Sequence, residues 1–392
     1  MPNLWSSNTP ARFWLVQPDI TAEQWADAIQ QALPVLGLAV DPRDADGLAV
    51  LILGEGQFGS DHWQLSWVKR WYYEIKPFIP RALVTMLRRI QSSSARAGFP
   101  LGWPIEERYA RFLWEVLRRC LVSSGERDVK FRPLWPDGRR FAFVLTHDVE
   151  TDKGQAHVGA VADLDERYGF RSSFNFVPER YHLDYGLLQE LRERGFEIGV
   201  HGLKHDGKLF SSYSRFTQRA TRINAYLEQL GAVGFRAPLT MRNPEWMQEL
   251  QIEYDLSFFD SDPYEPMAGG TMSIWPFIIG RFVELPYTLA QDHTLMSVLG
   301  ETTPRLWLEK VDFLESYMGM ALLNAHPDYL TAPTTWGVYA GFLEAMQGRG
   351  DYWHALPREV ARWWRARTSP TPAADSTVGR PEAVGPRPLP HT

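Results

Sequence analysis

The chain has 392 residues, of which 44% are hydrophobic and 13% aromatic, and its formal net charge at pH 7 is -6. This length exceeds one ordinary hydrophobic core, so we expect two domains with appendages. The negative charge argues against a nucleic-acid-binding protein, and the single cysteine excludes an internal disulfide framework and any multi-cysteine metal cluster. The first residues show no basic segment followed by an apolar run, and no stretch approaches the roughly 18 apolar residues of a membrane span. We therefore expect a cytoplasmic protein.

Residues 1–135 form the first predicted unit, a smaller α/β N-terminal domain of unknown role. Apolar runs predict strands at 12–16 and 48–54, and a helix is predicted at 23–33. A second helix is predicted from 104 to about 121, because its apolar residues recur at helical spacing and define one buried face.

The segment 64–96 carries seven Lys/Arg residues and one Glu, interleaved with aromatic residues. One interpretation is a contact with an anionic surface, which would place the protein peripherally at a membrane or on a polyanionic glycan. The other is an amphipathic helix that packs on the second domain with its arginines in solvent. The apolar stripe, which includes Leu83, Leu87 and Ile90, is as narrow as that of a core-facing helix, so the packed helix is favoured.

Residues 136–368 form the second predicted unit, in which strands and helices alternate regularly. The predicted strands are 141–146, 172–177, 197–200, 234–238, 256–261, 282–287 and 322–327. The predicted helices between them are about 155–168, 185–194, 212–230, 242–252 and 303–319. This alternation predicts a parallel sheet or barrel, and the number of strands favours a barrel smaller than the eight-stranded form. Residues 369–392 hold six prolines and almost no large apolar residues, which predicts a disordered tail.

Acids and histidines follow two of the predicted strands. The strand at 141–146 ends in T-H-D-V-E, residues 146–150, and the strand at 197–200 is followed by H-G-L-K-H, residues 201–205. The carboxyl ends of parallel strands meet at one edge, where α/β folds present ligands and catalytic groups. Two imidazoles four residues apart and two carboxylates two apart suit a divalent metal such as zinc, with one carboxylate left to accept a proton from water. The sequence therefore favours a metal site and hydrolysis.

Three further strand ends carry polar side chains that suit hydrolysis. His326, in N-A-H-P, can protonate a leaving group, because its ordinary pKa of about 6.5 allows proton transfer near neutral pH. Arg236, in F-R-A-P, can orient a carboxylate and lower its pKa. Asp260 or Asp262, in D-S-D-P-Y, can hydrogen-bond an imidazole and select its tautomer. Each signal alone is weak, but five in order at successive strand ends are jointly strong.

The order of these five motifs, over about residues 140–330, resembles the polysaccharide deacetylase superfamily (NodB homology, carbohydrate esterase family four). The resemblance implies a distorted (β/α) barrel of about seven strands, with a divalent metal, usually zinc, held by one acid and two histidines. By this resemblance, Asp148 matches the catalytic base and His326 the general acid. His201 and His205 match the two metal histidines. Arg236 matches the arginine that orients the base, and Asp260 matches the aspartate that orients the acid.

The first motif departs from the pattern of the superfamily. Its members usually carry two adjacent acids, of which the second binds the metal, whereas Val149 here separates Asp148 from Glu150. Some relatives with this wider spacing use the outer acid, so Glu150 is the candidate metal ligand and Asp148 the alternative. Gly202 replaces the hydroxyl residue that often follows the first histidine.

These observations predict a metal-dependent hydrolase of amide C–N bonds, which we expect to deacetylate an N-acetylated sugar in a polysaccharide or its precursor. Two alternatives stay open. The substrate could be a small non-sugar amide, since the superfamily includes such enzymes. The domain could also be a catalytically inactive module that binds or assembles polysaccharide.

Overall fold

The computed structural model of the chain describes residues 3–17, 20–38, 45–59, 62–63, 96–124 and 130–369. The predictions for the basic segment 64–96 and for the tail 369–392 lie outside these residues, apart from Arg96 and Ser369. Within the described ranges, no helix is both long enough and apolar enough to cross a membrane.

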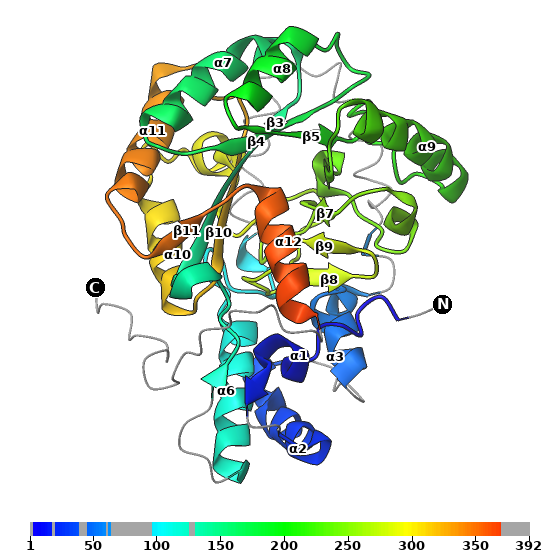
Figure 1. Cartoon of the computed structure of the whole chain (residues 1–392), viewed down its shortest axis with the longest axis vertical. Helices are drawn as coiled ribbons and strands as arrows, with labels where there is room; N and C mark the ends of the chain where they lie inside the picture. The colour runs from blue at the N-terminus through cyan, green and yellow to red at the C-terminus, as the bar shows by residue number, and fades with distance from the viewer. Residues whose placement is uncertain are drawn as a thin grey trace.

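One nine-stranded sheet forms the centre of the molecule (Figure 1). Its strands are β3 (Phe141–Val149), β4 (Ser172–Phe176), β5 (Glu197–His201), β6 (Gly234–Arg236), β7 (Tyr254–Asp255), β8 (Phe277–Ile279), β9 (Phe282–Glu284), β10 (Met320–Ala325) and β11 (Tyr352–His354). Their order is β10-β3-β4-β5-β6-β7-β9-β8, and β11 pairs with the start of β3. Among these strands, only β8 and β9 pair in antiparallel fashion. Six of the seven predicted strands are confirmed, whereas the strand predicted at 256–261 is wrong, because β7 ends just before it.

Helices flank this sheet and connect its strands (Figure 1). They are α7 (Asp152–Arg167), α8 (Tyr185–Glu193), α9 (Tyr213–Gln229), α10 (Arg305–Ser316), α11 (Pro333–Gln347) and α12 (Pro357–Thr368). Thr151, Asp184 and Ser212 cap the N-termini of α7, α8 and α9 with their side-chain oxygens. Because helices cover the sheet, β3 is buried along its whole length, which explains its apolar start. Four of the five predicted helices are confirmed; the segment 242–252 contains only a 3₁₀ turn, Trp246–Glu249.

The sheet curls into a barrel whose last side is closed by irregular chain. Its outer strands, β10 and β8, do not pair with each other. Instead, the backbone N–H groups of Thr288 and Leu289, which follow β9, both donate to Leu322 O on β10, at 3.2 and 3.1 Å. Just before them, Tyr287 forms an isolated bridge with Phe259. The prediction of a distorted (β/α) barrel is thereby confirmed.

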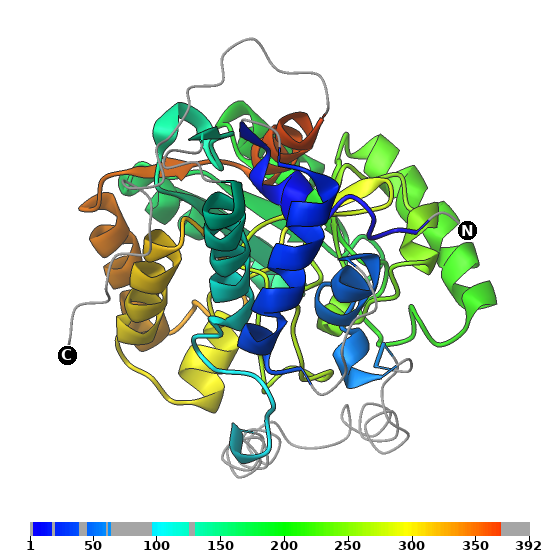
Figure 2. The ribbon, with the colours of Figure 1, turned by 90° about the horizontal axis from the view of Figure 1, so that it is seen from below.

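The described part of the N-terminal region is mainly helical. It contains α1 (Pro10–Trp14), α2 (Ala22–Ala32), α3 (Ala45–Ile52) and α6 (Arg108–Ser124), and a two-residue ladder joins β1 (Val16–Gln17) to β2 (Lys130–Phe131). Helices α2 and α6 lie side by side (Figure 2). The predicted helices at 23–33 and 104–121 are confirmed, but the predicted strands at 12–16 and 48–54 are wrong. Thr9 and Pro10 start a helix before the first run, and a short apolar run such as the second does not distinguish a strand from a buried helix.

The N-terminal region packs directly on the barrel. The Asn8 side chain exchanges two hydrogen bonds with the backbone of Ile278 on β8, at 2.8 and 2.9 Å. The Glu55 carboxylate accepts two hydrogen bonds from the buried Arg242 guanidinium, at 2.7 and 2.5 Å. The buried apolar side chains of both parts form one continuous cluster. The domain boundaries after residues 135 and 368 stay predictions.

Candidate metal centre and active site

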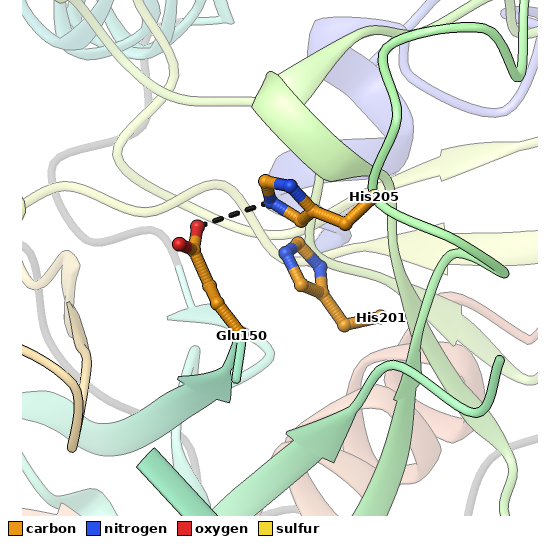
Figure 3. A group of neighbouring side chains, drawn as sticks. All are labelled: Glu150, His201 and His205. Carbon is orange, nitrogen blue, oxygen red and sulfur yellow. Dashed lines mark ion pairs between the residues drawn. The ribbon is translucent and has the colours of Figure 1, made fainter. Parts of the chain in front are cut away.

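Glu150, His201 and His205 converge at the carboxyl-terminal edge of the sheet (Figure 3). Their ligand atoms lie within 4.8 Å of one another, and Glu150 Oε1 is 3.0 Å from His205 Nε2. His201 Nδ1 contacts Arg236 O at 3.1 Å, which leaves Nε2 of the same ring for a metal. One carboxylate and two imidazoles are a donor set typical of zinc. These three residues therefore fit the divalent metal that the sequence predicts.

The convergence follows from the strand order. Glu150 directly follows β3 and His201 ends β5, and β4 lies between these two strands with all three parallel. The chain then turns tightly to bring in His205, with Gly202 at φ 63° and His205 at φ 51°. A Cβ at position 202 would lie 2.4 Å from Pro238 Cγ. Local packing thus explains why a glycine, rather than a hydroxyl residue, follows the first histidine.

The protonation states of His201 and Glu150 suit metal binding. Burial lowers the pKa of His201 to about 4, against the opposing effect of the Asp148 carboxylate, so the imidazole is neutral at neutral pH. Burial alone would raise the pKa of Glu150, but the neighbouring His205 imidazole holds it well below its ordinary value. A neutral imidazole and an ionised carboxylate are the forms that bind a metal.

The turn that carries Glu150 is fixed from two sides. The backbone N–H of Glu150 donates to Asp328 Oδ2 at 3.0 Å, and the Thr151 hydroxyl donates to the other oxygen of this carboxylate. Thr151 Oγ1 also accepts the Gly154 N–H at 3.2 Å as the N-cap of α7. The start of α7 is therefore tied to the segment that follows His326.

Asp148 lies in a buried network of hydrogen-bond donors. Its Oδ1 accepts from Arg236 Nη1 and Asn175 Nδ2, and its Oδ2 accepts from Asn324 Nδ2, each at 3.0 Å. The contact predicted between Arg236 and a carboxylate is thus present. A Cβ at Gly199 on β5 would lie 2.1 Å from Asn175 Oδ1, so this glycine makes room for the asparagine.

The Asp148 oxygen Oδ2 also faces two imidazoles. It lies 3.8 Å from His201 Nε2 and 4.0 Å from His326 Nε2. Burial alone would raise the pKa of Asp148, but Arg236 and the two imidazoles hold it well below the ordinary range. Asp148 is therefore an ionised carboxylate situated between the metal donor set and His326.

His326 is held by Asp292 rather than by a residue that the sequence singled out. Asp292 Oδ1 contacts His326 Nδ1 at 2.6 Å, and Oδ2 accepts the backbone N–H of the same histidine at 2.8 Å. Burial lowers the pKa of His326, but the Asp292 carboxylate outweighs it and raises the pKa to about 10. His326 is therefore charged at neutral pH, and its Nε2 can donate a proton.

The prediction that Asp260 orients His326 is wrong. The Asp260 carboxylate forms an ion pair with Lys310, which also donates to Pro104 O. Burial raises the pKa of Asp260 to about 6 despite this lysine. Asp292 takes the place predicted for Asp260 because the segment after β9 carries Asp292 to the side of the barrel where His326 lies.

Sequence reasoning also missed Asn175 and Asn324. Both stand between apolar residues of buried strands, in F-N-F and L-L-N-A. A polar side chain inside a buried strand needs a hydrogen-bond partner, and this signal could have found them. Asp292 is the N-cap of a π-helix, His293–Val298, and no strand-end pattern points to it.

No protein-family model matches the sequence, and no curated protein matches it significantly. Among solved structures, a protein from Mycobacterium smegmatis described as a polysaccharide deacetylase matches with a TM-score of 0.50 and 21% identity, over 62% of this chain and 97% of that protein. This chain has the polysaccharide deacetylase fold.

Two further solved structures match slightly less well. A protein from Pseudomonas aeruginosa PAO1 described as a polysaccharide deacetylase gives a TM-score of 0.49 at 16% identity, over 60% of this chain and 94% of that protein. The PuuE allantoinase gives 0.48 at 15% identity, over 60% of this chain and 93% of that protein. Within the polysaccharide deacetylase fold of this chain, the ends of β3, β5, β6 and β10 present the polar side chains described above.

Proposed function

We propose that this protein is a metal-dependent deacetylase that hydrolyses the N-acetyl amide of a sugar in a polysaccharide or its precursor. The observation that carries the proposal is a zinc-type donor set beside an ionised carboxylate and a charged imidazole at one sheet edge. Amide hydrolysis needs a polarised carbonyl, a base for water and an acid for the leaving nitrogen. The fold supports the same class of reaction.

Glu150, His201 and His205 would hold the metal, and zinc best suits their donor atoms. When bound, the metal supplies a Lewis acid that polarises the acyl carbonyl and makes water more acidic. Glu150 is favoured over Asp148 as the ligand, because both oxygens of Asp148 already accept hydrogen bonds from side chains.

Two residues beside this donor set, Asp148 and His326, carry out the two proton transfers of the reaction. Asp148 accepts a proton from the attacking water, because it is ionised and its Oδ2 faces His201. Arg236 holds the other oxygen of this carboxylate in place. As the C–N bond breaks, His326 donates its Nε2 proton to the leaving nitrogen, and Asp292 stabilises the imidazolium before transfer. The products are acetate and a sugar with a free amine.

An N-acetylated glycan is the favoured substrate class because a protein described as a polysaccharide deacetylase shares the fold. A small non-sugar amide would use the same three chemical functions, so the assay must include both classes. A cytoplasmic location and a peripheral membrane contact through 64–96 stay predictions.

The test combines metal analysis with turnover. Protein purified without added metal should hold about one zinc-like divalent ion per chain, and it should release acetate from oligomers of N-acetylglucosamine. His201→Ala and His205→Ala should lose metal and activity together. Asn224→Ala is the matched control, because the Asn224 side chain bonds only main-chain groups near the end of η6 (Trp246–Glu249) and should leave both properties unchanged.

Two other outcomes of these assays would change the proposal. Turnover of small amides without release of acetate from the oligomers would reassign the substrate. A protein that binds no divalent metal and hydrolyses neither class would contradict the enzyme and favour an inactive binding module.

A further inference from the structure

Two side chains that the proposed mechanism does not use extend the network around Asp148. Gln291 Oε1 accepts a hydrogen bond from Asn324 Nδ2 at 3.1 Å, and Gln291 Nε2 donates to Glu265 Oε1 at 2.5 Å. Asn324 Nδ2 is the nitrogen that also donates to Asp148 Oδ2. An unbroken line of hydrogen bonds therefore leads from Asp148 through Asn324 and Gln291 to Glu265.

The Asn324 amide has buried partners on both its nitrogen and its oxygen. Its nitrogen donates to Asp148 and Gln291, while its Oδ1 accepts from Arg236 Nη1 at 2.5 Å. The nitrogen of a primary amide only donates and its oxygen only accepts, so only one orientation satisfies these three contacts. A flipped amide would set its oxygen against Asp148 and its nitrogen against Arg236.

Gln291 can favour this orientation of the Asn324 amide only if the Gln291 amide is itself fixed. Glu265 fixes the Gln291 amide. The Glu265 carboxylate is held by the hydroxyls of Thr240, after β6, and Tyr287, after β9, each at 2.9 Å. The Glu265 carboxylate also accepts a hydrogen bond from the nitrogen of Gln291, which leaves the Gln291 oxygen toward Asn324. Glu265 and Gln291 are each 9% exposed and Asn324 is 1% exposed, so water competes little for these bonds.

We propose that Gln291 and Glu265 are positioning residues for Asp148. Glu265 orients Gln291, and Gln291 orients the Asn324 amide. Asn324 then aims an N–H at Asp148 Oδ2, the oxygen that faces His201 and His326. The inference rests on the proposed function, because it assigns these residues to the base of that reaction. Its consequence is that turnover depends on a glutamine that is two hydrogen bonds away from the base.

A double-mutant cycle on turnover tests the proposal. Gln291→Met keeps the length of the side chain and removes its amide, and Asn324→Ala removes the next link. We expect Gln291→Met to lower kcat about tenfold, with KM and bound metal unchanged, and to have little further effect when Asn324→Ala is present. Gln248→Met is the matched control, because the Gln248 amide bonds only main-chain groups of Pro244, Ile279 and Arg281, and it should keep kcat.

A second measurement does not depend on turnover. In protein labelled with nitrogen-15 asparagine, the side-chain amide of Asn324 is identified by the signal that Asn324→Ala loses. Its hydrogens should exchange with solvent about tenfold faster in Gln291→Met than in the wild type, since a donor bond is lost. If the wild type hydrolyses no substrate, the proposed function fails, while this exchange rate still decides whether Gln291 orients Asn324. Unchanged kcat, additive effects in the cycle, or an unchanged exchange rate would each overturn the inference.

Discussion

The Asp292→Asn substitution tests how His326 keeps its proton. Asp292 contacts both Nδ1 and the backbone N–H of His326, at 2.6 and 2.8 Å, and is fully buried. Burial lowers the pKa of His326 and the Asp292 carboxylate raises it, with a net value of about 10. Asparagine keeps the shape and one acceptor oxygen but carries no charge, so the effect of burial remains while the opposing charge is removed.

The expected loss of activity follows from these pKa values. Without the carboxylate, the pKa of His326 should fall toward its ordinary value of 6.5, because burial then acts against only the more distant charges of Glu150 and Asp148. At pH 8, such a group is only about 3% protonated, whereas the wild-type imidazole is almost fully protonated, so kcat should fall roughly thirtyfold. A general acid works below its pKa and fails as pH rises through it, so the alkaline limit of activity should move downward. A bound cation lowers the pKa in both proteins, and the difference between them is therefore the diagnostic quantity.

The assay is acetate release from roughly pH 5 to pH 10, with bound metal measured for each variant. Asp260→Asn is the control, because Asp260 pairs with Lys310 and not with His326. It should lower stability and leave the alkaline limit in place. An alkaline limit that stays unchanged in Asp292→Asn, or that moves in Asp260→Asn instead, would refute the reasoning.

Three further predictions concern the two acids of the first motif and two buried carboxyls. Asp148→Asn should lower kcat about a thousandfold and keep the metal, whereas Glu150→Gln should lose the metal; exchanged results in metal analysis would reverse these roles. Burial raises the pKa of Glu197 to about 7. The folded state therefore holds this proton more tightly than the unfolded state, and wild-type stability should fall by roughly 3 kcal/mol as pH rises from about 4.5 to 7. Glu197→Gln should flatten that slope in urea unfolding, and an unchanged slope would disprove this origin. Glu55→Gln leaves the Arg242 guanidinium buried without its counter-charge, so it should lower the free energy of unfolding by about 3 kcal/mol in the same assay. A decrease below about 0.5 kcal/mol would contradict the contribution of this ion pair.

The sequence by itself determined six strands of the sheet and the residues that stand at the ends of β3, β5, β6 and β10. A strand covered on both faces appears as an apolar run, and β3, β5 and β10 were recognised in this way. Parallel strands end at the same edge, so side chains that follow them must gather there. For this reason the sequence predicts that Asp148, His201, Arg236 and His326 gather at one edge, and in the structure the other three lie within hydrogen-bonding or ion-pair distance of Asp148.

Only the tertiary structure decided which carboxylate holds His326 and which amides surround Asp148. Asp260 follows the strand predicted at 256–261, so strand-end reasoning pointed to it, but Asp292 reaches the histidine through the chain that closes the barrel beside β10. Likewise, the apolar run at 48–54 became a helix because of what it packs against. Local patterns specify the buried face of an element, since the spacing of apolar residues depends on neighbours along the chain. The course of an irregular segment depends on contacts between residues far apart in sequence, such as Thr288 with Leu322, and these exist only once the barrel has formed.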